Sequence, residues 1–358
     1  MKRRDFLMTA SLAPAGMLLP AHVFADMAPA SAKSWRVFET TTRVEVLKPV
    51  GMTKVWLPLP LINDTHYQKS LGNQWHAEGG KVQVVNNPLQ NAGIVSAEFA
   101  DGAKPVLELK SRFATMDRFT DFAATQSNTN EDMSRFVQAT ELKPTDGIVK
   151  ATADKITAGV TGDVEKARAI YNWIVDNTFR DPKTRGCGVG DIKYMLETNS
   201  MGGKCADINA LFVALARASG VPARDVYGVR VADSKNGYKS LGKSGAITKA
   251  QHCRAEFYAA GLGWIPVDPA DVRKVMLEED GGLPATHEKV IAARKFLFGN
   301  WEMNWLAYNN AYDVKLPGSD KKPIGFLMYP QCETTEGRRD CLDADAFKYE
   351  MTSREIIV

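Results

Sequence analysis

Apolar residues repeat with helical spacing between residues 205 and 218, the most strongly patterned stretch of the chain. The apolar positions lie three or four residues apart, at Ile208, Leu211, Phe212 and Leu215. Gly220 and the following Val-Pro end the run, so Cys205 falls in the first turn of a predicted helix. Unpaired amides and the positive end of the helix dipole stabilise an anion there, which predicts a thiol that ionises readily. The alternative is a buried structural cysteine.

The pattern divides the rest of the chain into segments of different type. Residues 34–114 hold short β-type runs separated by turn residues and predict a small N-terminal antiparallel β domain. Residues 115–145 are polar and lack periodicity, so they are interpreted as a linker. Helical periodicity returns over 146–158 and 163–177.

Two β runs flank a glycine-bearing turn at 259–263 and predict a hairpin. We expect Tyr258 to lie opposite Trp264. That register makes His252 a diagonal neighbour of Asp268 on one face of the hairpin. The two side chains can therefore meet, although a core histidine that merely pairs with an aspartate would give the same pattern.

Residues 1–25 are typical of an export signal. Paired arginines at 3 and 4 are followed by Phe-Leu, an apolar stretch to Leu19 and a small-residue pattern that ends at Ala25, which resembles a twin-arginine signal. The apolar stretch is short for a membrane span and is interrupted by prolines and a glycine. We therefore expect a periplasmic protein, exported folded, with no stable membrane insertion after signal removal.

Composition and charge narrow the class of protein. The chain has 358 residues, 44% hydrophobic and 24% charged, which is typical of a soluble globular protein. Its formal charge is +3, most of it in the predicted signal, so the mature chain is nearly neutral. A nearly neutral chain gives no reason to expect a nucleic acid partner.

Five cysteines occur, at positions 187, 205, 253, 332 and 341. Because an oxidising compartment pairs thiols, an odd number leaves at least one free. Cys332 with Cys341 is the easiest disulfide to expect, and Cys187 with Cys253 would be a second, leaving Cys205 free; other pairings stay open. The spacings match no zinc pattern, and we expect neither a metal nor another cofactor.

A thiol at a helix start, an imidazole and a carboxylate are the parts of a nucleophilic triad. Cys205 would attack a carbonyl carbon and His252 would transfer the proton to the leaving amine. Asp268 would orient the imidazole and stabilise its charged form.

The supporting residues of such a site are less defined. The backbone N–H of Cys205 can donate to the developing oxyanion, and a second donor is needed. Tyr194 and Trp173 are candidates for it that the sequence does not separate. Asp207 is interpreted as a first-turn acid that complements the helix dipole, in preference to a contact for a substrate amine.

Three short sequences resemble the transglutaminase-like superfamily of cysteine acyltransferases and peptidases. They are Gly-Lys-Cys-Ala-Asp at 203–207, Gln-His-Cys-Arg-Ala-Glu-Phe at 251–257 and Gly-Trp-Ile-Pro-Val-Asp-Pro at 263–269. The resemblance covers about residues 163–272 and implies the roles of nucleophile, base and orienting acid for Cys205, His252 and Asp268. It also implies an α+β, papain-like core in which the cysteine helix packs on an antiparallel sheet. We place this core at 146–272, followed by a C-terminal extension, 273–358, that completes the sheet and carries the disulfide loop.

The resemblance leaves the reaction open. Animal members cross-link glutamine to lysine with calcium, whereas bacterial members more often resemble thiol peptidases or amidases, and some have lost the triad. This chain has all three residues and no calcium loop of EF-hand type. We expect a thiol-dependent acyl hydrolase that acts on amide bonds of proteins or peptidoglycan peptides. A cross-linking acyltransferase and a non-catalytic binding protein that keeps the fold are the alternatives.

Overall fold

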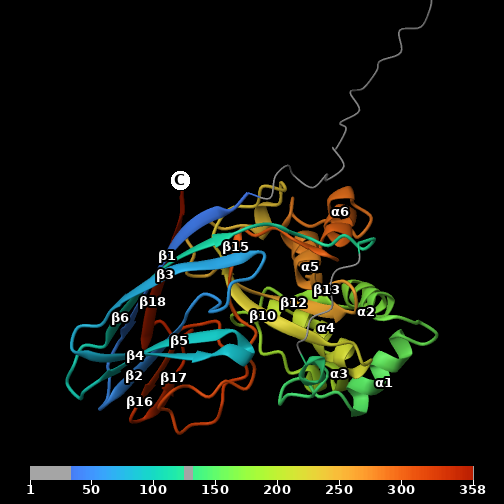
Figure 1. Cartoon of the computed structure of the whole chain (residues 1–358). Coiled ribbons are helices and arrows are strands. Elements are labelled where there is room, and N and C mark those ends of the chain that lie inside the picture. Colours follow the sequence, from blue (N-terminus) through green and yellow to red (C-terminus); the bar gives the residue numbers. More distant parts are fainter. Residues whose placement is uncertain (1–33, 125–131, 358) are drawn as a thin grey trace, which may run out of the picture. The chain divides into compact units, whose positions relative to one another are not determined.

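The alternating segments near the N-terminus form a β sandwich together with strands from the end of the chain. The computed structural model describes residues 34–124 and 132–357. The sandwich strands are β1 Arg36–Val46, β2 Thr53–Pro58, β3 Gln68–His76, β4 Gly80–Asn87, β5 Ala92–Phe99, β6 Val106–Thr115, β11 Gly245–Ala246, β16 Gln331–Thr334, β17 Gly337–Arg339 and β18 Phe347–Ile356. One antiparallel sheet has the order β11-β18-β1-β6-β3 and the other β17-β16-β2-β5-β4 (Figure 1).

Alternation of side chains explains why these two sheets pack face to face. Val44 and Val46, two residues apart on β1, are buried with Leu57 of β2 and Phe99 of β5 in one apolar cluster. Side chains of a strand point alternately to opposite faces, so one face of each sheet can be apolar. Each fully buried side chain of this kind contributes roughly 1.5–3 kcal/mol.

A separate sheet, outside the sandwich, carries the predicted hairpin. It consists of β10 Ala223–Arg230, β12 Gln251–Ala259, β13 Gly263–Val267 and β15 Trp305–Asn309, in the antiparallel order β13-β12-β10-β15. Tyr258 lies opposite Trp264, which confirms the predicted register. The predicted helix is also confirmed as α4, Cys205–Ala218, and Gly220 follows it with a φ of +82°.

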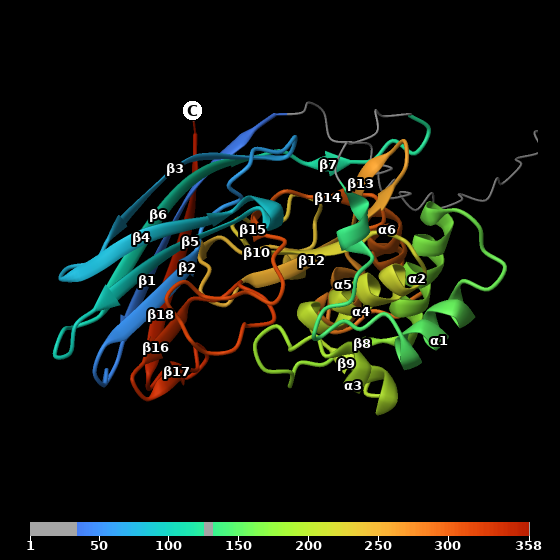
Figure 2. The ribbon, with the colours of Figure 1, turned by 60° about the horizontal axis from the view of Figure 1, so that its bottom comes forward.

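Helix α4 packs against β10 and β12, and other helices cover it (Figure 2). These helices are α1 Gly147–Ile156, α2 Asp163–Asn177, α3 Ile192–Glu197 and α5 Pro269–Glu278, with α6 Glu288–Phe296 against α5. Every residue of α4 is buried, because this mostly apolar helix is surrounded by the sheet and the other helices. The fold is thus α+β with a β-rich N-terminal region, as the sequence predicted.

The C-terminal extension divides between the two parts of the fold. Strand β15 is the last strand of the β13-β12-β10-β15 sheet, whereas β16, β17 and β18 pair with strands of the sandwich. The predicted loop disulfide between Cys332 and Cys341 is not formed, and both thiols are free. Cys332 lies opposite Arg339 in the β16–β17 hairpin, so Cys341 is two residues beyond the directly opposed position. A disulfide needs closer Cβ atoms than such a diagonal pair offers.

The segment interpreted as a linker is partly folded onto the core. Strand β7, Arg118–Phe119, pairs with β14, Asn300–Trp301, and a 3₁₀ turn spans Met133–Phe136. One compact unit runs from Lys33 to Val358. The predicted export signal, residues 1–25, lies outside the described residues, as do residues 125–131. Among the described residues, no helix has the length and apolar character needed to cross a membrane.

Candidate active site

The start of α4 is held by the carboxylate of Asp207. Its Oδ2 accepts the backbone N–H of Lys204 at 3.0 Å, and its Oδ1 accepts those of Val189 and Gly190 at 3.0 and 2.9 Å. Burial raises the pKa of Asp207, although these amides oppose the shift. The side chain therefore caps the helix and ties the glycine-rich loop 186–190 to it.

The loop requires glycine where it approaches Asp207. Gly188 has a φ of +94°, and a Cβ atom there would lie 1.9 Å from the Asp207 Oδ2. The loop also accepts a backbone amide from α4, because the Cys187 carbonyl accepts the N–H of Ala206 at 2.9 Å. This contact brings Cys187 beside the first turn of the helix.

The hairpin brings His252 to Asp268. The imidazole Nε2 lies 2.7 Å from the Asp268 Oδ2, and both side chains are buried. Asp268 also caps α5, since its Oδ1 accepts the N–H of Asp271 at 3.1 Å. The carboxylate is therefore fixed by the helix that it starts.

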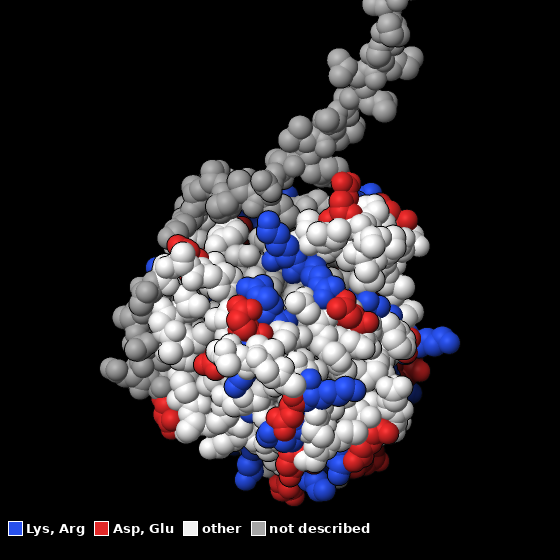
Figure 3. Space-filling model, turned by 90° about the vertical axis from the view of Figure 1, so that its right-hand side faces the viewer, with Lys and Arg blue, Asp and Glu red and all other residues white. Residues whose placement is uncertain are grey.

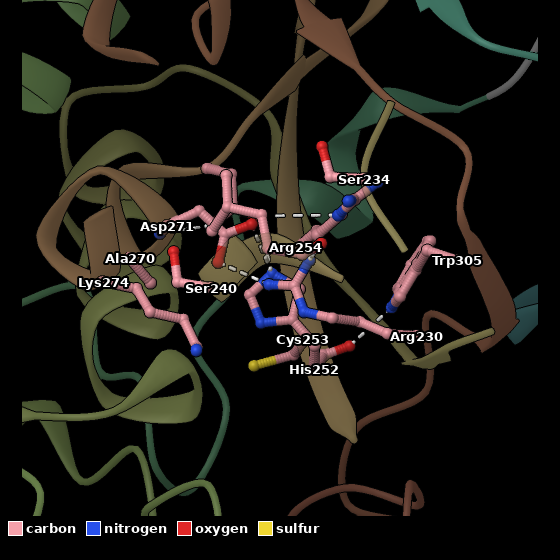
Figure 4. A network of polar contacts seen from close by, with 12 residues as sticks. Arg230, Ser234, Ser240, His252, Cys253, Arg254, Ala270, Asp271, Lys274 and Trp305 are labelled. Atoms are coloured by element: carbon pink, nitrogen blue, oxygen red, sulfur yellow. Dashed lines mark hydrogen bonds and ion pairs between the residues drawn. The ribbon is translucent and has the colours of Figure 1, made fainter. Parts of the chain in front are cut away.

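Side chains from four other positions complete the cluster around His252, and three of them, Arg230, Arg254 and Asp271, are labelled in Figure 4. Sequence reasoning missed Arg230, Asp271 and the fourth, Asn209. Asn209 donates to the Asp268 Oδ1 at 3.1 Å, and Arg254 Nε lies 3.5 Å from the Asp268 Oδ2. Asp271 Oδ2 lies 3.4 Å from the imidazole Nε2, and its Oδ1 accepts from Arg230 at 2.6 Å. One signal in the sequence could have pointed to Asn209. It lies four residues after Cys205, among mostly apolar residues of the same helix.

The charges of this cluster favour a protonated imidazole. Burial and the Arg230 guanidinium oppose protonation, but the carboxylates of Asp271 and Asp268 outweigh them and raise the pKa of His252 to about 10. Burial raises the pKa of Asp268, with Asp271 adding to the effect. Arg230 overcomes burial at Asp271 and holds the pKa of that carboxyl well below its usual range.

The pKa of the Cys205 thiol is shifted in the opposite direction to that of His252. Hydrogen bonds from the thiols of Cys187 and Cys253, together with His252, outweigh burial and hold the pKa of Cys205 well below its usual range. The same contact with Cys205, along with burial, raises the pKa of Cys187 well above its usual range. A thiolate beside an imidazolium is the charge state that this arrangement stabilises.

The predicted disulfide between Cys187 and Cys253 is not formed, and both are free thiols. Both thiols instead interact electrostatically with Cys205, which raises the pKa of each. The Cys187 thiol also donates to the carbonyl of Gln251 at 3.3 Å. Cys187 and Cys253 thus each interact with Cys205 and do not bond to each other.

The two candidates for a second oxyanion donor lie elsewhere. Tyr194 is 60% exposed on α3, and Trp173 lines a surface groove with Leu196 and Met201. Within the described residues, neither has a polar contact with Cys205 or His252. Tyr329, which the sequence did not single out, instead lies beside the glycine-rich loop, because a Cβ atom at Gly186 would be 3.1 Å from its hydroxyl.

His252, Asp268 and Asp271 also have the spacing of a metal site, because one ligand atom from each lies within 4.8 Å of the others. Both carboxylates already contact arginine side chains. A cation placed there would face two guanidinium groups at close range, so the electrostatics favour the imidazolium.

The sequence model of the transglutaminase-like superfamily matches residues 150–269, which contain Cys205, His252 and Asp268. The domain formed by these residues belongs to the transglutaminase-like superfamily. Members of this superfamily are typically cysteine-dependent enzymes.

Two further comparisons cover nearly the whole chain. An uncharacterized protein of Haemophilus influenzae is 36% identical over 344 residues, which are 89% of this chain and 92% of that protein. The crystal structure of a candidate cysteine protease from Cytophaga hutchinsonii has a TM-score of 0.51 at 14% identity and covers 90% of this chain and 89% of its own. The sandwich and the core therefore share a fold with that protein.

The periplasmic domain of TgpA from Pseudomonas aeruginosa is a more distant match. It has a TM-score of 0.36 at 16% identity and covers 67% of this chain and 90% of its own. A match at that level carries no conclusion about fold or activity.

Proposed function

We propose that this protein is an exported thiol-dependent acyl hydrolase that cleaves amide bonds through Cys205, His252 and Asp268. The observation that carries the proposal is the placement of one imidazole between a carboxylate and a thiol. His252 Nε2 lies 2.7 Å from Asp268, and the same imidazole helps to lower the pKa of Cys205. This is the order of contacts that nucleophilic catalysis by cysteine requires.

Acylation follows from the charge state of the pair. The Cys205 thiolate attacks the carbonyl carbon of the amide and forms a tetrahedral intermediate. Since Nε2 of His252 faces Asp268, Nδ1 is the ring nitrogen that gives its proton to the leaving amine. The C–N bond then breaks and leaves an acyl group on the sulfur.

Deacylation uses the same groups in reverse. Neutral His252 accepts a proton from water through Nδ1, the hydroxide oxygen attacks the thioester carbon, and the acid and the thiolate are released. Asp268 keeps the imidazole oriented in both steps. For the oxyanion we assign the N–H of Cys205, because the neighbouring amides of Ala206 and Ile208 already donate to carbonyl groups.

The surface supports a peptide substrate in preference to a polyanion. Basic and acidic side chains are interspersed on the helical face of the molecule (Figure 3). Proteins and peptidoglycan peptides of the periplasm are the substrates that we propose, on the strength of the signal-like sequence at residues 1–25.

A thiol-directed acylating probe tests the mechanism. Purified mature protein should be labelled at Cys205, the Cys205→Ala variant should not be labelled there, and His252→Ala should be labelled far more slowly. Equal labelling of the wild type and the His252→Ala variant would contradict an activated thiolate. Amide hydrolysis that persists in Cys205→Ala would remove the mechanism.

A second assay separates hydrolysis from transfer. The acyl-enzyme is offered a primary amine, and the products are divided into free acid and new amide. Free acid as the main product supports the hydrolase, whereas new amide as the main product would make the protein an acyltransferase.

A further inference from the structure

Three thiols meet at the start of α4, and the proposed reaction uses one of them. Cys187, Cys205 and Cys253 come from the glycine-rich loop, the helix and β12, and all three lie in one buried cluster. The Cys187 and Cys253 thiols both help to lower the pKa of Cys205. An acyl transfer needs a single sulfur, so neither of these two thiols forms or breaks a bond in the proposed reaction.

The backbone brings Cys187 close to Cys205 independently of the sulfur contacts. The Cys187 carbonyl accepts the N–H of Ala206, the residue after Cys205, at 2.9 Å. The Cys187 thiol also donates to the carbonyl of Gln251, which precedes His252, at 3.3 Å. Hydrogen bonds therefore link Cys187 both to α4, the helix that carries Cys205, and to β12, the strand that carries His252.

The two flanking cysteines differ in how freely they can move toward Cys205. Cys187 lies between Gly186 and Gly188, which have φ values of +57° and +94° in a loop without regular structure. Cys253 is fully buried in β12, between β10 and β13, and its carbonyl accepts from Asn209 at 2.8 Å. A disulfide needs specific Cα and Cβ distances, which a loop residue can reach with less cost than a central strand.

We propose that Cys187 is a resolving cysteine that forms a reversible disulfide with Cys205 when the nucleophile is oxidised. The inference rests on the proposed function, since it requires a reactive thiolate at Cys205. It adds a modification site and a means of regulation to the same centre.

The chemistry needs a peroxide as the oxidant. The Cys205 thiolate attacks one peroxide oxygen, the O–O bond breaks, sulfur loses two electrons, and a sulfenic acid forms while the departing hydroxide takes the proton of the His252 imidazolium as water. The Cys187 sulfur then attacks the sulfenic sulfur, the S–O bond breaks, and the departing hydroxide takes the Cys187 proton as water. The resulting S–S bond blocks acyl transfer, protects Cys205 from further oxidation and is reopened by a dithiol reductant.

Peptide mapping by mass spectrometry after hydrogen peroxide treatment tests the proposal without an activity assay. Trypsin separates the cysteines, because cleavage after Arg185, Lys193, Lys204 and Arg217 releases Cys187 and Cys205 in different peptides. In the oxidised wild type, peptides 186–193 and 205–217 should be joined, and dithiothreitol should restore both thiols. Cys253→Ser should behave like the wild type.

The Cys187→Ser variant should instead accumulate sulfinic acid at Cys205, which dithiothreitol does not reverse. Sulfinic acid at Cys205 in the wild type, or a crosslink from Cys205 to Cys253, would overturn the assignment of Cys187 and leave the proposed function intact. Unmodified thiols on both peptides, together with slow labelling by the acylating probe, would overturn the reactive thiolate itself.

Discussion

Asn209 gives the sharpest test of how the site is held together. Its side chain is fully buried and makes three hydrogen bonds. The amide donates to the carbonyl of Cys253 at 2.8 Å and to the Asp268 Oδ1 at 3.1 Å, and its oxygen accepts the N–H of Ala270 at 3.2 Å. Asn209→Ala removes all three and leaves one buried carbonyl and one first-turn amide of α5 without this partner.

The expected loss of stability follows from those two backbone groups. A buried polar group that loses its partner costs about 1–3 kcal/mol, so with two such groups the free energy of unfolding should fall by roughly 2–6 kcal/mol. Asn309 is a matched control, because it is also fully buried and also serves one carbonyl and one amide. It donates to Leu327 at 2.8 Å and accepts from Ala311 at 3.1 Å.

The two variants should differ in the chemistry of Cys205. Asn209→Ala frees Asp268 on one side, so His252 is positioned less well, and acylation by the thiol-directed probe should slow about 10- to 100-fold. Asn309→Ala should lose similar stability, measured by urea unfolding, with an unchanged acylation rate. Equal acylation rates in two folded variants would refute the assignment of Asn209 as a positioning residue.

Three further predictions concern stability and pH. Glu256→Gln breaks a fully buried ion pair with two arginines and should lower the free energy of unfolding by about 3–5 kcal/mol in a urea titration; a change below about 1 kcal/mol would contradict that role. Gly188→Ala forces a Cβ atom to within 1.9 Å of Asp207 and should both destabilise the fold and slow Cys205 acylation; wild-type values in both assays would show that the loop adjusts freely. The raised pKa of His252, about 10 against an ordinary 6.5, means that its protonation stabilises the fold below pH 6.5 and that this contribution is lost as the pH rises toward 10. In the wild type, the lowered pKa of Cys205 offsets this between about pH 6.5 and 9, because folding then leaves the number of bound protons unchanged. Cys205→Ser should therefore lose stability over that range while the wild type stays nearly constant, and parallel curves would refute the thiolate–imidazolium pair.

Local sequence patterns were sufficient to predict the structure wherever the interacting residues are near one another along the chain. Helix α4 follows from its apolar spacing and its terminating glycine, and the meeting of His252 with Asp268 follows from a hairpin that separates them by 16 residues. Hairpin register depends on turn length and alternation, both of which the sequence displays. The capping role of Asp207 could be read in the same way, from its position in the first turn.

Contacts between distant segments could not be read from such patterns. Asn209 and Asp268 are 59 residues apart, and Arg230 and Asp271 are 41 apart. Charge and polarity at these positions fit a solvated surface as well as a buried network until the fold packs them together. The cysteines illustrate the same limit, because their number suggested pairing, whereas their distances depend on where the loops lie.

The sequence by itself therefore determined the nucleophile's helix and the hairpin, since each rests on periodicity within a short segment, and the α+β class followed from the family resemblance of three short motifs. The tertiary structure alone decided which groups surround His252, which thiols contact Cys205 and which sheet receives β16 to β18. Those outcomes depend on packing between distant segments. Burial there removes water, which strengthens the interaction with each neighbouring charge or hydrogen-bonding group.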